Sequence, residues 1–223
     1  MKINTKDLVL KELIEKEWII TNGIGGYSSS TVIGMNTRKY HGLLVAPLTP
    51  PARRFLILSK IDESIEIKGK KYDLYSNMCK NYISEGYKYL EEFEKDYIPI
   101  FTYKVKDIVI KKIICMEHGR NTVCVLYKIQ NNGENAKFTL TPIINFRDFH
   151  TVTINHEFQV KQNVNNKKVK IELDGNSNNP IYMYSSDGNY IEYYNNTFRE
   201  MYYIEEEKRG IFPEENLNVP RKL

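Results

Sequence analysis

Segments in which apolar and polar residues alternate one by one recur through most of this chain. Ile65 and Ile67 alternate with charged or hydroxyl-bearing neighbours. The same period of two returns in 123–129, 136–141 and 168–173. Successive side chains of a β-strand point to opposite faces of its sheet, so this period is typical of strands with one buried face. The alternation therefore predicts a chain built mainly from half-buried antiparallel strands.

Turn-forming residues separate the alternating segments. They are Gly69-Lys70, Asn131–Gly133, Asn163–Asn166, Asp174-Gly175 and Asp187-Gly188. Many short strands joined by such turns are typical of a sandwich or barrel and not of βαβ units. We therefore predict an all-β fold, a large antiparallel β-sandwich in which about a dozen or more strands form two packed sheets.

The two ends of the chain depart from this pattern. Residues 5–16 favour a short helix, because Thr5 is a suitable cap and apolar residues are spaced four apart. The segment 205–223 holds a run of charges followed by two prolines. We predict that 1–204 forms one β-sandwich domain and that 205–223 is an exit segment leading out of it.

Composition argues against several classes of function. The net charge is +4, from 32 basic and 28 acidic residues that are interleaved, whereas nucleic-acid binding normally needs a concentrated basic face. The sequence holds no membrane-spanning apolar run and no signal-peptide core, so we expect no membrane contact and a cytoplasmic location. The four histidines lack metal-ligand spacing, and we expect neither a metal nor a cofactor.

The three cysteines agree with a reducing compartment. Cys79, Cys115 and Cys124 show no paired spacing. Cys115 and Cys124 lie in apolar strand-like runs, where a thiol is most simply a small buried hydrophobe.

A glycine cluster near the start resembles a phosphate-binding loop only superficially. It reads Gly23-Ile24-Gly25-Gly26, but the third glycine of a dinucleotide fingerprint would fall at Ser28. Strand-forming residues follow it in place of a helix. The glycines are therefore predicted to form a tight corner, with positive φ or close approach of backbone.

The residues around this cluster resemble a known enzyme family. Glu17-Trp18, Thr21–Tyr27 and Asn36–Val45 match in order the opening of the N-terminal domain of bacterial and archaeal glycogen debranching enzymes, of the amylo-α-1,6-glucosidase type. Collinear matches continue at Pro50-Pro51, Leu58–Lys60, His118–Val123, Phe146–His150 and Tyr202–Glu215. The resemblance implies a β-sandwich of the kind called a supersandwich.

The resemblance also implies a function and a partner. The full enzyme would hydrolyse α-1,6-linked glucose at trimmed branch points of glycogen. A C-terminal catalytic domain, a double ring of helices, would hold the general acid and base, so we expect no catalytic residue in this chain. The chain alone is expected to be inactive, as a truncated piece or a naturally split half. Glycogen or another α-glucan is the expected ligand.

Two polar and aromatic clusters are the candidates for substrate binding. They contain Arg38, Tyr40 and His41, and then Arg147, Asp148 and His150. Planar hydrogen-bonding groups and aromatic rings suit the hydroxyls and flat C–H faces of a glucan. We expect the first cluster at the edge of the glucan site. The alternative, commoner for internal polar residues, is that Arg38 pairs with Asp148 while Tyr40 and His41 satisfy buried backbone groups.

Other aromatic residues leave further alternatives open. Trp18 is expected in the core, because Ile19 and Ile20 adjoin it. The tyrosines 82, 87, 89 and 97 either dock against the helical domain or pack within strands. Three rival roles remain besides the shaping of a glucan site: an independent carbohydrate-binding module with exposed aromatics in a row, a purely structural brace, and a self-sufficient hydrolase, which we do not expect.

Overall fold

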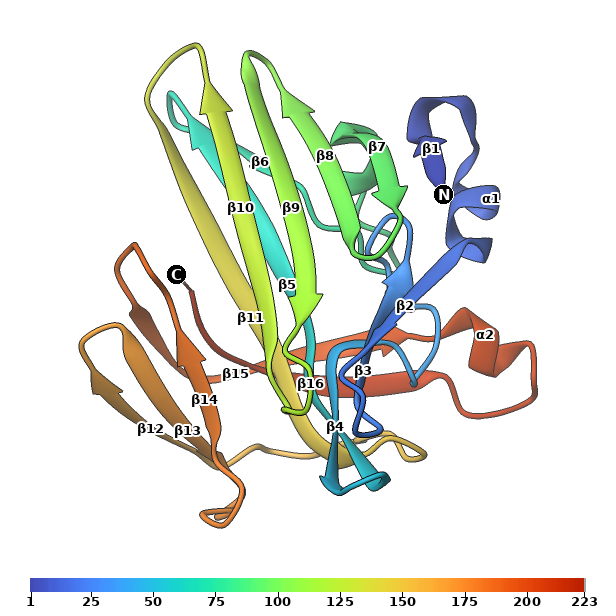
Figure 1. Cartoon of the computed structure of the whole chain (residues 1–223), viewed down its shortest axis with the longest axis vertical. Helices are drawn as coiled ribbons and strands as arrows, with labels where there is room; N and C mark the ends of the chain where they lie inside the picture. Colours follow the sequence, from blue (N-terminus) through green and yellow to red (C-terminus); the bar gives the residue numbers. More distant parts are fainter. Residues whose placement is uncertain (223) are drawn as a thin grey trace.

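In a computed structural model, the strands of the described residues form three antiparallel sheets (Figure 1). The structure describes the backbone of residues 1–222 and the side chains of these except 192–196, 199, 221 and 222. Strands account for 55% of the chain and helices for 8%, which confirms the prediction of an all-β sandwich. Among the described residues no helix is long and apolar enough to cross a membrane.

Each sheet is built from strands that pair mostly with close neighbours in sequence. The five-stranded sheet has the order β1 (Lys2–Asn4), β7 (Leu90–Lys95), β8 (Pro99–Val105), β9 (Ile108–Met116), β10 (Val123–Asn131). The eight-stranded sheet has the order β15 (Ile191–Tyr202), β16 (Glu214–Lys222), β11 (Ala136–Asp148), β5 (Ala52–Ile67), β4 (Gly42–Thr49), β3 (Tyr27–Thr31), β2 (Glu17–Thr21), and β6 (Lys70–Asp73) pairs with β5. The three-stranded sheet contains β12 (Val160–Asn165), β13 (Lys168–Leu173) and β14 (Ile181–Tyr184).

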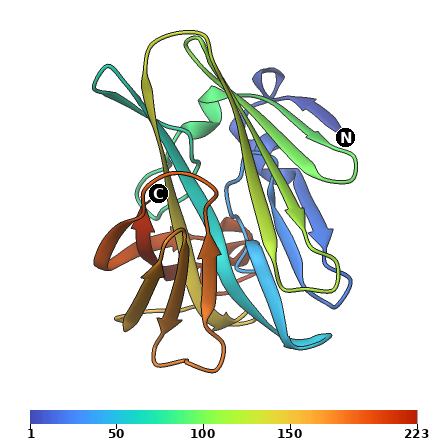
Figure 2. The ribbon, with the colours of Figure 1, turned by 60° about the vertical axis from the view of Figure 1, so that its left-hand side comes forward.

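The main core fills the space between the two large sheets, which Figure 2 shows as adjacent layers. Trp18 is 3% exposed, donates its indole N–H to the Thr31 carbonyl oxygen and meets Phe101 edge to face. Its prediction as a core residue is confirmed. A second cluster, which includes Ile144, Val169 and other apolar residues, joins the three-stranded sheet to the eight-stranded one.

The predicted N-terminal helix is shorter than expected. A single turn of 3-10 helix, η1, covers Thr5–Asp7, and α1 covers only Leu10–Glu15. Thr5 does not cap α1; it is 4% exposed and its hydroxyl donates to the Leu90 carbonyl oxygen. Two more short helices, η2 (Gly86–Tyr89) and α2 (Ile204–Glu207), occur in the described chain.

The predicted exit segment 205–223 needs correction. Its residues Glu214–Lys222 form β16, which lies between β15 and β11 in the eight-stranded sheet. Leu217 is fully buried there. The charge run suggested a solvated tail, but the segment turns back through α2 and its later residues pair with two strands. Where the domain ends along the chain stays a prediction.

The cysteines also differ from expectation. Cys79 is buried, but Cys115 is half-buried and Cys124 is exposed. The last two are opposite each other on β9 and β10, and they point away from the core because their neighbours Ile114 and Val125 pack into it. Apolar neighbours thus misled the prediction of two buried thiols.

The tyrosine-rich segment divides between core and surface. Tyr87 and Tyr89 pack against the main core, which is the strand-packing alternative. Tyr82 and Tyr97 are 54% and 85% exposed. Docking of this region against another domain stays a prediction.

Candidate functional site

The structure brings together the two polar and aromatic clusters that lie far apart in the sequence. The first is in the loop between β3 and β4; of the second, Arg147 and Asp148 are the last residues of β11 and His150 lies in the turn that follows. The Tyr40 hydroxyl oxygen lies 3.3 Å from Nδ1 of His150, and the two rings meet edge to face. Lys39 donates from Nζ to the His150 carbonyl oxygen at 2.5 Å. Residues more than a hundred positions apart therefore form one surface, called here the Tyr40–His150 surface.

Phe149 and Arg54 extend this surface. The Phe149 ring lies 5.5 Å from the Tyr40 ring and 4.1 Å from the His150 ring, between centroids. The Arg54 guanidinium carbon lies 5.6 Å from the centre of Phe149. His150 is exposed, while Tyr40 and Phe149 are half-buried. Such a surface offers rings for stacking and polar ends for hydrogen bonding to a ligand.

Arg38 lies beside this surface and joins two carboxylates. Its Nε is 2.7 Å from Oε1 of Glu17, and its second terminal nitrogen is 3.7 Å from Oε2 of Glu205. The predicted ion pair between Arg38 and Asp148 does not form. Asp148 instead accepts the backbone N–H of His150 at 2.9 Å, which fixes the turn that presents the imidazole. The side chains of Arg38, Glu17 and Glu205 remain partly exposed, so they offer hydrogen-bond donors and acceptors to a ligand.

His41 has a structural position. It is 3% exposed, and its Nδ1 accepts the backbone N–H of Thr37 at 3.1 Å. This hydrogen bond leaves the ring proton on Nε2, which lies 3.4 Å from Oε1 of Glu17. His41 thus satisfies a buried backbone group, as the structural alternative predicted. Its Nε2 also holds the Glu17 carboxylate in position.

His41 and Arg38 together lower the pKa of the Glu17 carboxyl group. Partial burial by itself raises the pKa of its carboxyl group, but the hydrogen bonds from His41 and Arg38 and the positive charge of Arg38 outweigh burial and lower that pKa. A carboxyl group held ionised in this way accepts hydrogen bonds and is a poor general acid.

Arg147 anchors the surface from beneath. It is 5% exposed, and its guanidinium group forms a fork on Glu215, with 2.9 Å between its terminal nitrogen and Oε2. The same terminal nitrogen donates to the Lys39 carbonyl oxygen at 2.8 Å. Arg147 therefore joins β11, β16 and the loop before Tyr40, and its burial leaves it no contact with a ligand.

Sequence reasoning missed the centre of this network, Glu215. Its carboxylate also accepts from the Tyr203 hydroxyl at 2.5 Å, from Nδ2 of Asn145 and from the backbone N–H of Thr153. Burying an ionised carboxylate without partners costs free energy, and these four donor residues offset that cost for Glu215. The available signal in the sequence was the alternation of Glu215, Leu217 and Val219 with two asparagines, which places the glutamate on the apolar face of a strand.

The glycine corner forms as predicted. Gly23 and Gly25 have φ of 80° and 98°, and a Cβ on Gly25 would lie 2.6 Å from the Pro51 carbonyl oxygen. Oδ1 of Asn22 accepts the amides of Ile24 and Gly26, so these two donors are used inside the loop. Both observations agree with a tight corner and not with a phosphate cradle.

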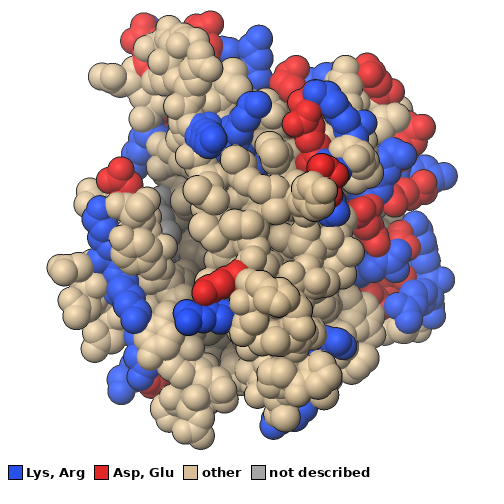
Figure 3. All heavy atoms as spheres, viewed as in Figure 1, with Lys and Arg blue, Asp and Glu red and all other residues tan. Residues whose placement is uncertain are grey.

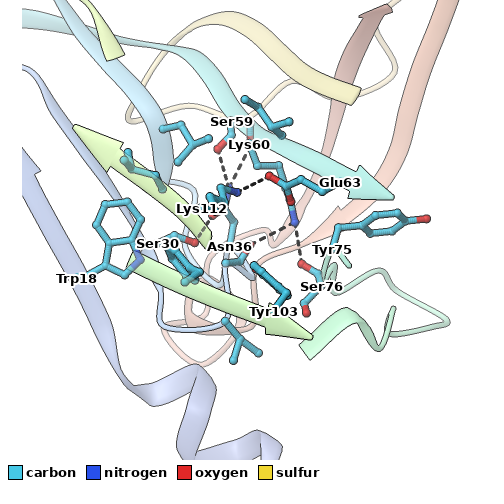
Figure 4. A pocket seen from close by; sticks show the side chains of 16 residues that line it. Trp18, Ser30, Asn36, Ser59, Lys60, Glu63, Tyr75, Ser76, Tyr103 and Lys112 are labelled. Atoms are coloured by element: carbon cyan, nitrogen blue, oxygen red, sulfur yellow. Dashed lines mark hydrogen bonds and ion pairs between the residues drawn. The ribbon is translucent and has the colours of Figure 1, made fainter. Parts of the chain in front are cut away.

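A buried polar network between the large sheets surrounds a cavity of about 20 Å³ (Figure 4). Lys60 pairs with Asp62 at 3.2 Å, and Lys112 pairs with Glu63 at 2.6 Å. Burial lowers the pKa of Lys60 and raises that of Asp62. This cavity has room for about one water molecule, so it does not bind a sugar.

A larger cavity of about 200 Å³ lies beside β16. It is lined by Thr153, Ile154, Asn155, Glu200, Glu214, Glu215 and Asn216. Glu215 is held by Arg147, and Glu214 pairs with Lys80 at 2.8 Å. Two of the three carboxylates are thus committed to ion pairs. Among the described residues there is no group of three His, Cys, Asp or Glu side chains suited to a metal ion.

The described residues therefore form an all-β sandwich that carries one anchored, partly exposed polar surface. Residues 16–223 match the family described as the N-terminal domain of glycogen debranching enzyme, and the chain belongs to this family. No curated protein and no solved structure matches the chain.

Proposed function

We propose that this chain supports and shapes the glucan site of a glycogen debranching enzyme. Hydrolysis of α-1,6-linked glucose belongs, in this proposal, to a C-terminal helical domain of the same enzyme. The observation that supports it best is the convergence of the Tyr40 loop and the His150 turn on one partly exposed surface. Family membership supplies the substrate class, an α-glucan.

The chemistry of the surface suits a supporting role. Tyr40, Phe149 and His150 present ring faces and polar ends, and Arg38 with its two carboxylates presents donors and acceptors. Buried Arg147 and His41 hold the loop and the turn in place. A binding surface supported by a second layer of hydrogen bonds keeps its geometry without a ligand. Free thiols agree with a cytoplasmic location for such an enzyme.

The proposal is tested in an enzyme that carries both domains. Tyr40→Ala and His150→Ala are expected to raise KM for a branched α-glucan severalfold, because each removes a contact outside the catalytic carboxylates. The matched control is Ile129→Ala, which removes a side chain that is 45% exposed on β10, outside the tyrosine-rich segment that is a candidate for docking.

The outcome separates the two main roles. Unchanged kinetics in both variants, with unchanged thermal stability, would reject the proposal. Lost stability with unchanged KM would favour the structural brace. Release of glucose by the 223-residue chain without a helical domain would overturn the assignment of catalysis to that domain.

A further inference from the structure

The three-stranded sheet has one face that the main site does not use. Its inner face packs Val169, Ile171 and Leu173 against the eight-stranded sheet. Its outer face belongs to the alternate residues, because side chains of a strand alternate between faces. The sheet lies at the lower left of Figure 1, away from the five-stranded sheet.

The outer face repeats one combination of residues in two successive rows. Asn165, Lys168 and Tyr184 are opposite one another across β12, β13 and β14. Asn163, Lys170 and Tyr182 form the next row in the same order. The rows are two residues apart along each strand, about 6.6 Å. The face therefore presents the same amide, ammonium group and phenol ring twice at a regular spacing.

The two rings of this face are unusually open for tyrosines. Tyr184 is 73% exposed and Tyr182 is 57% exposed. Lys168 Nζ lies 4.6 Å from the centre of the Tyr182 ring, and Lys170 Nζ is paired with Glu172 at 2.6 Å. Figure 3 shows a column of basic side chains at the left of the molecule, in the region of this sheet.

We propose that this outer face binds a chain of an α-glucan, as a second contact apart from the Tyr40–His150 surface. Exposed rings stack on the flat C–H faces of sugars, and amide and ammonium groups donate to hydroxyls. Two equal rows suit a linear polymer of equal units better than a single small molecule. The proposal rests on the proposed function for its ligand class.

A single-stranded nucleic acid is the other polymer that stacks on exposed tyrosines, but it also needs a positively charged groove. Lys170 is neutralised by Glu172 here, and Lys161 is opposite Glu172 in the register. Glu172 offsets one of the three lysines Lys161, Lys168 and Lys170, and the remaining charge is spread over a sheet face and does not line a groove, which favours a neutral polymer.

A second contact has a physical consequence for an enzyme that acts on a large polymer. Once one branch is held on the three-stranded sheet, neighbouring branches are presented to the main site at a high effective concentration. This rise in effective concentration applies to glycogen, and it is absent for a short oligosaccharide that reaches only one of the two surfaces.

The test is native gel electrophoresis of the 223-residue chain with glycogen in the gel. The unaltered chain is expected to be retarded. The double change Tyr182→Ala/Tyr184→Ala is expected to raise Kd about tenfold or more, because two stacking contacts are lost. Tyr97→Ala is the matched control and should be retarded like the unaltered chain. The conservative pair Tyr182→Phe/Tyr184→Phe keeps the rings and should still bind, and a thermal unfolding midpoint of the alanine double variant equal to that of the unaltered chain excludes a folding defect.

Several results would overturn the proposal. These are no retardation of the unaltered chain, equal retardation of the alanine double variant, or retardation by oligothymidylate but not by glycogen. The main site is judged separately, with Tyr40→Ala in the two-domain enzyme acting on a short branched oligosaccharide. If Tyr40→Ala leaves that activity unchanged while the tyrosine rows still bind glycogen, the proposed function fails and this inference stands.

Discussion

At the scale of single residues, burial decides which polar side chains are open to a ligand and which can only support the surface. Arg38, Tyr40 and His150 remain at least partly exposed, whereas His41 and Arg147 are 3% and 5% exposed. All five have planar side chains that form hydrogen bonds, so sequence alone placed them together as candidates. Only the fold separates contact from support.

Glu17 gives a prediction in pH at this scale. Its pKa in the folded protein is lowered from an ordinary value of about 4.5. As the pH falls, Glu17 is therefore protonated in the unfolded chain before it is protonated in the folded protein. Stability contributed by Glu17 is therefore present above pH about 4.5 and is lost as the pH falls through the folded pKa. Glu17→Gln should show a smaller loss of stability between pH 6 and pH 4.

Urea unfolding at the two pH values measures this difference. Glu134→Gln serves as control, because Glu134 pairs with Lys68 at an exposed position. An acid-induced loss that is equal in Glu17→Gln and in the unaltered chain would contradict the linkage.

At the scale of elements, β16 shows how pairing overrides local composition. Its segment begins after a charge run and contains a proline, and both features suggested a solvated tail. Alternate residues of β16 nevertheless bury Glu215 and Leu217, and its backbone pairs with β15 and β11. The signal of period two was present but too short to outweigh the charges.

The burial of Leu217 makes the role of β16 measurable. Leu217→Ala is expected to lower the free energy of unfolding by about 2–5 kcal/mol, because it leaves a cavity in a packed core. Ile211→Ala, at a residue that is 36% exposed in the same segment, should change it by about 0.5 kcal/mol or less. The free energies of unfolding are measured by chemical denaturation. Equally small changes in Leu217→Ala and Ile211→Ala would show that the segment is only loosely attached to the sheet.

At the scale of the whole molecule, a buried ion pair joins the two large sheets. Lys112 on β9 lies 2.6 Å from Glu63 on β5, and their side chains are 8% and 4% exposed. The Tyr127 hydroxyl donates to the same carboxylate from β10. Charges are costly in such a core unless they are paired, so we expect this pair to favour the one arrangement of the two sheets in which its partners meet.

A double-mutant cycle tests this cross-sheet pair. Lys112→Met alone should destabilise the fold by about 3–5 kcal/mol, because it leaves an unpaired carboxylate between the sheets. The double variant Lys112→Met/Glu63→Gln should recover a large part of that loss, since the amide keeps an acceptor for Tyr127 without a charge. Additive losses in the denaturation curves would show that the two side chains act independently.

The sequence by itself determined the strand-rich class, the main turns, the burial of Trp18 and the family. These features depend on local alternation, on residues that tolerate positive φ, and on a collinear set of motifs. Each depends on local residue patterns or on the order of such patterns along the chain, so no knowledge of the folded chain was needed.

Only the tertiary structure decided the partners of the polar residues and the count of sheets. Arg38 pairs with Glu17 and Glu205 and not with Asp148, and Arg147 reaches Glu215 across 68 positions. The repeated rows on the three-stranded sheet appear only once the register of β12, β13 and β14 is known. Charge pairing and strand register depend on distances in space, and a chain sets those distances only when its sheets have packed.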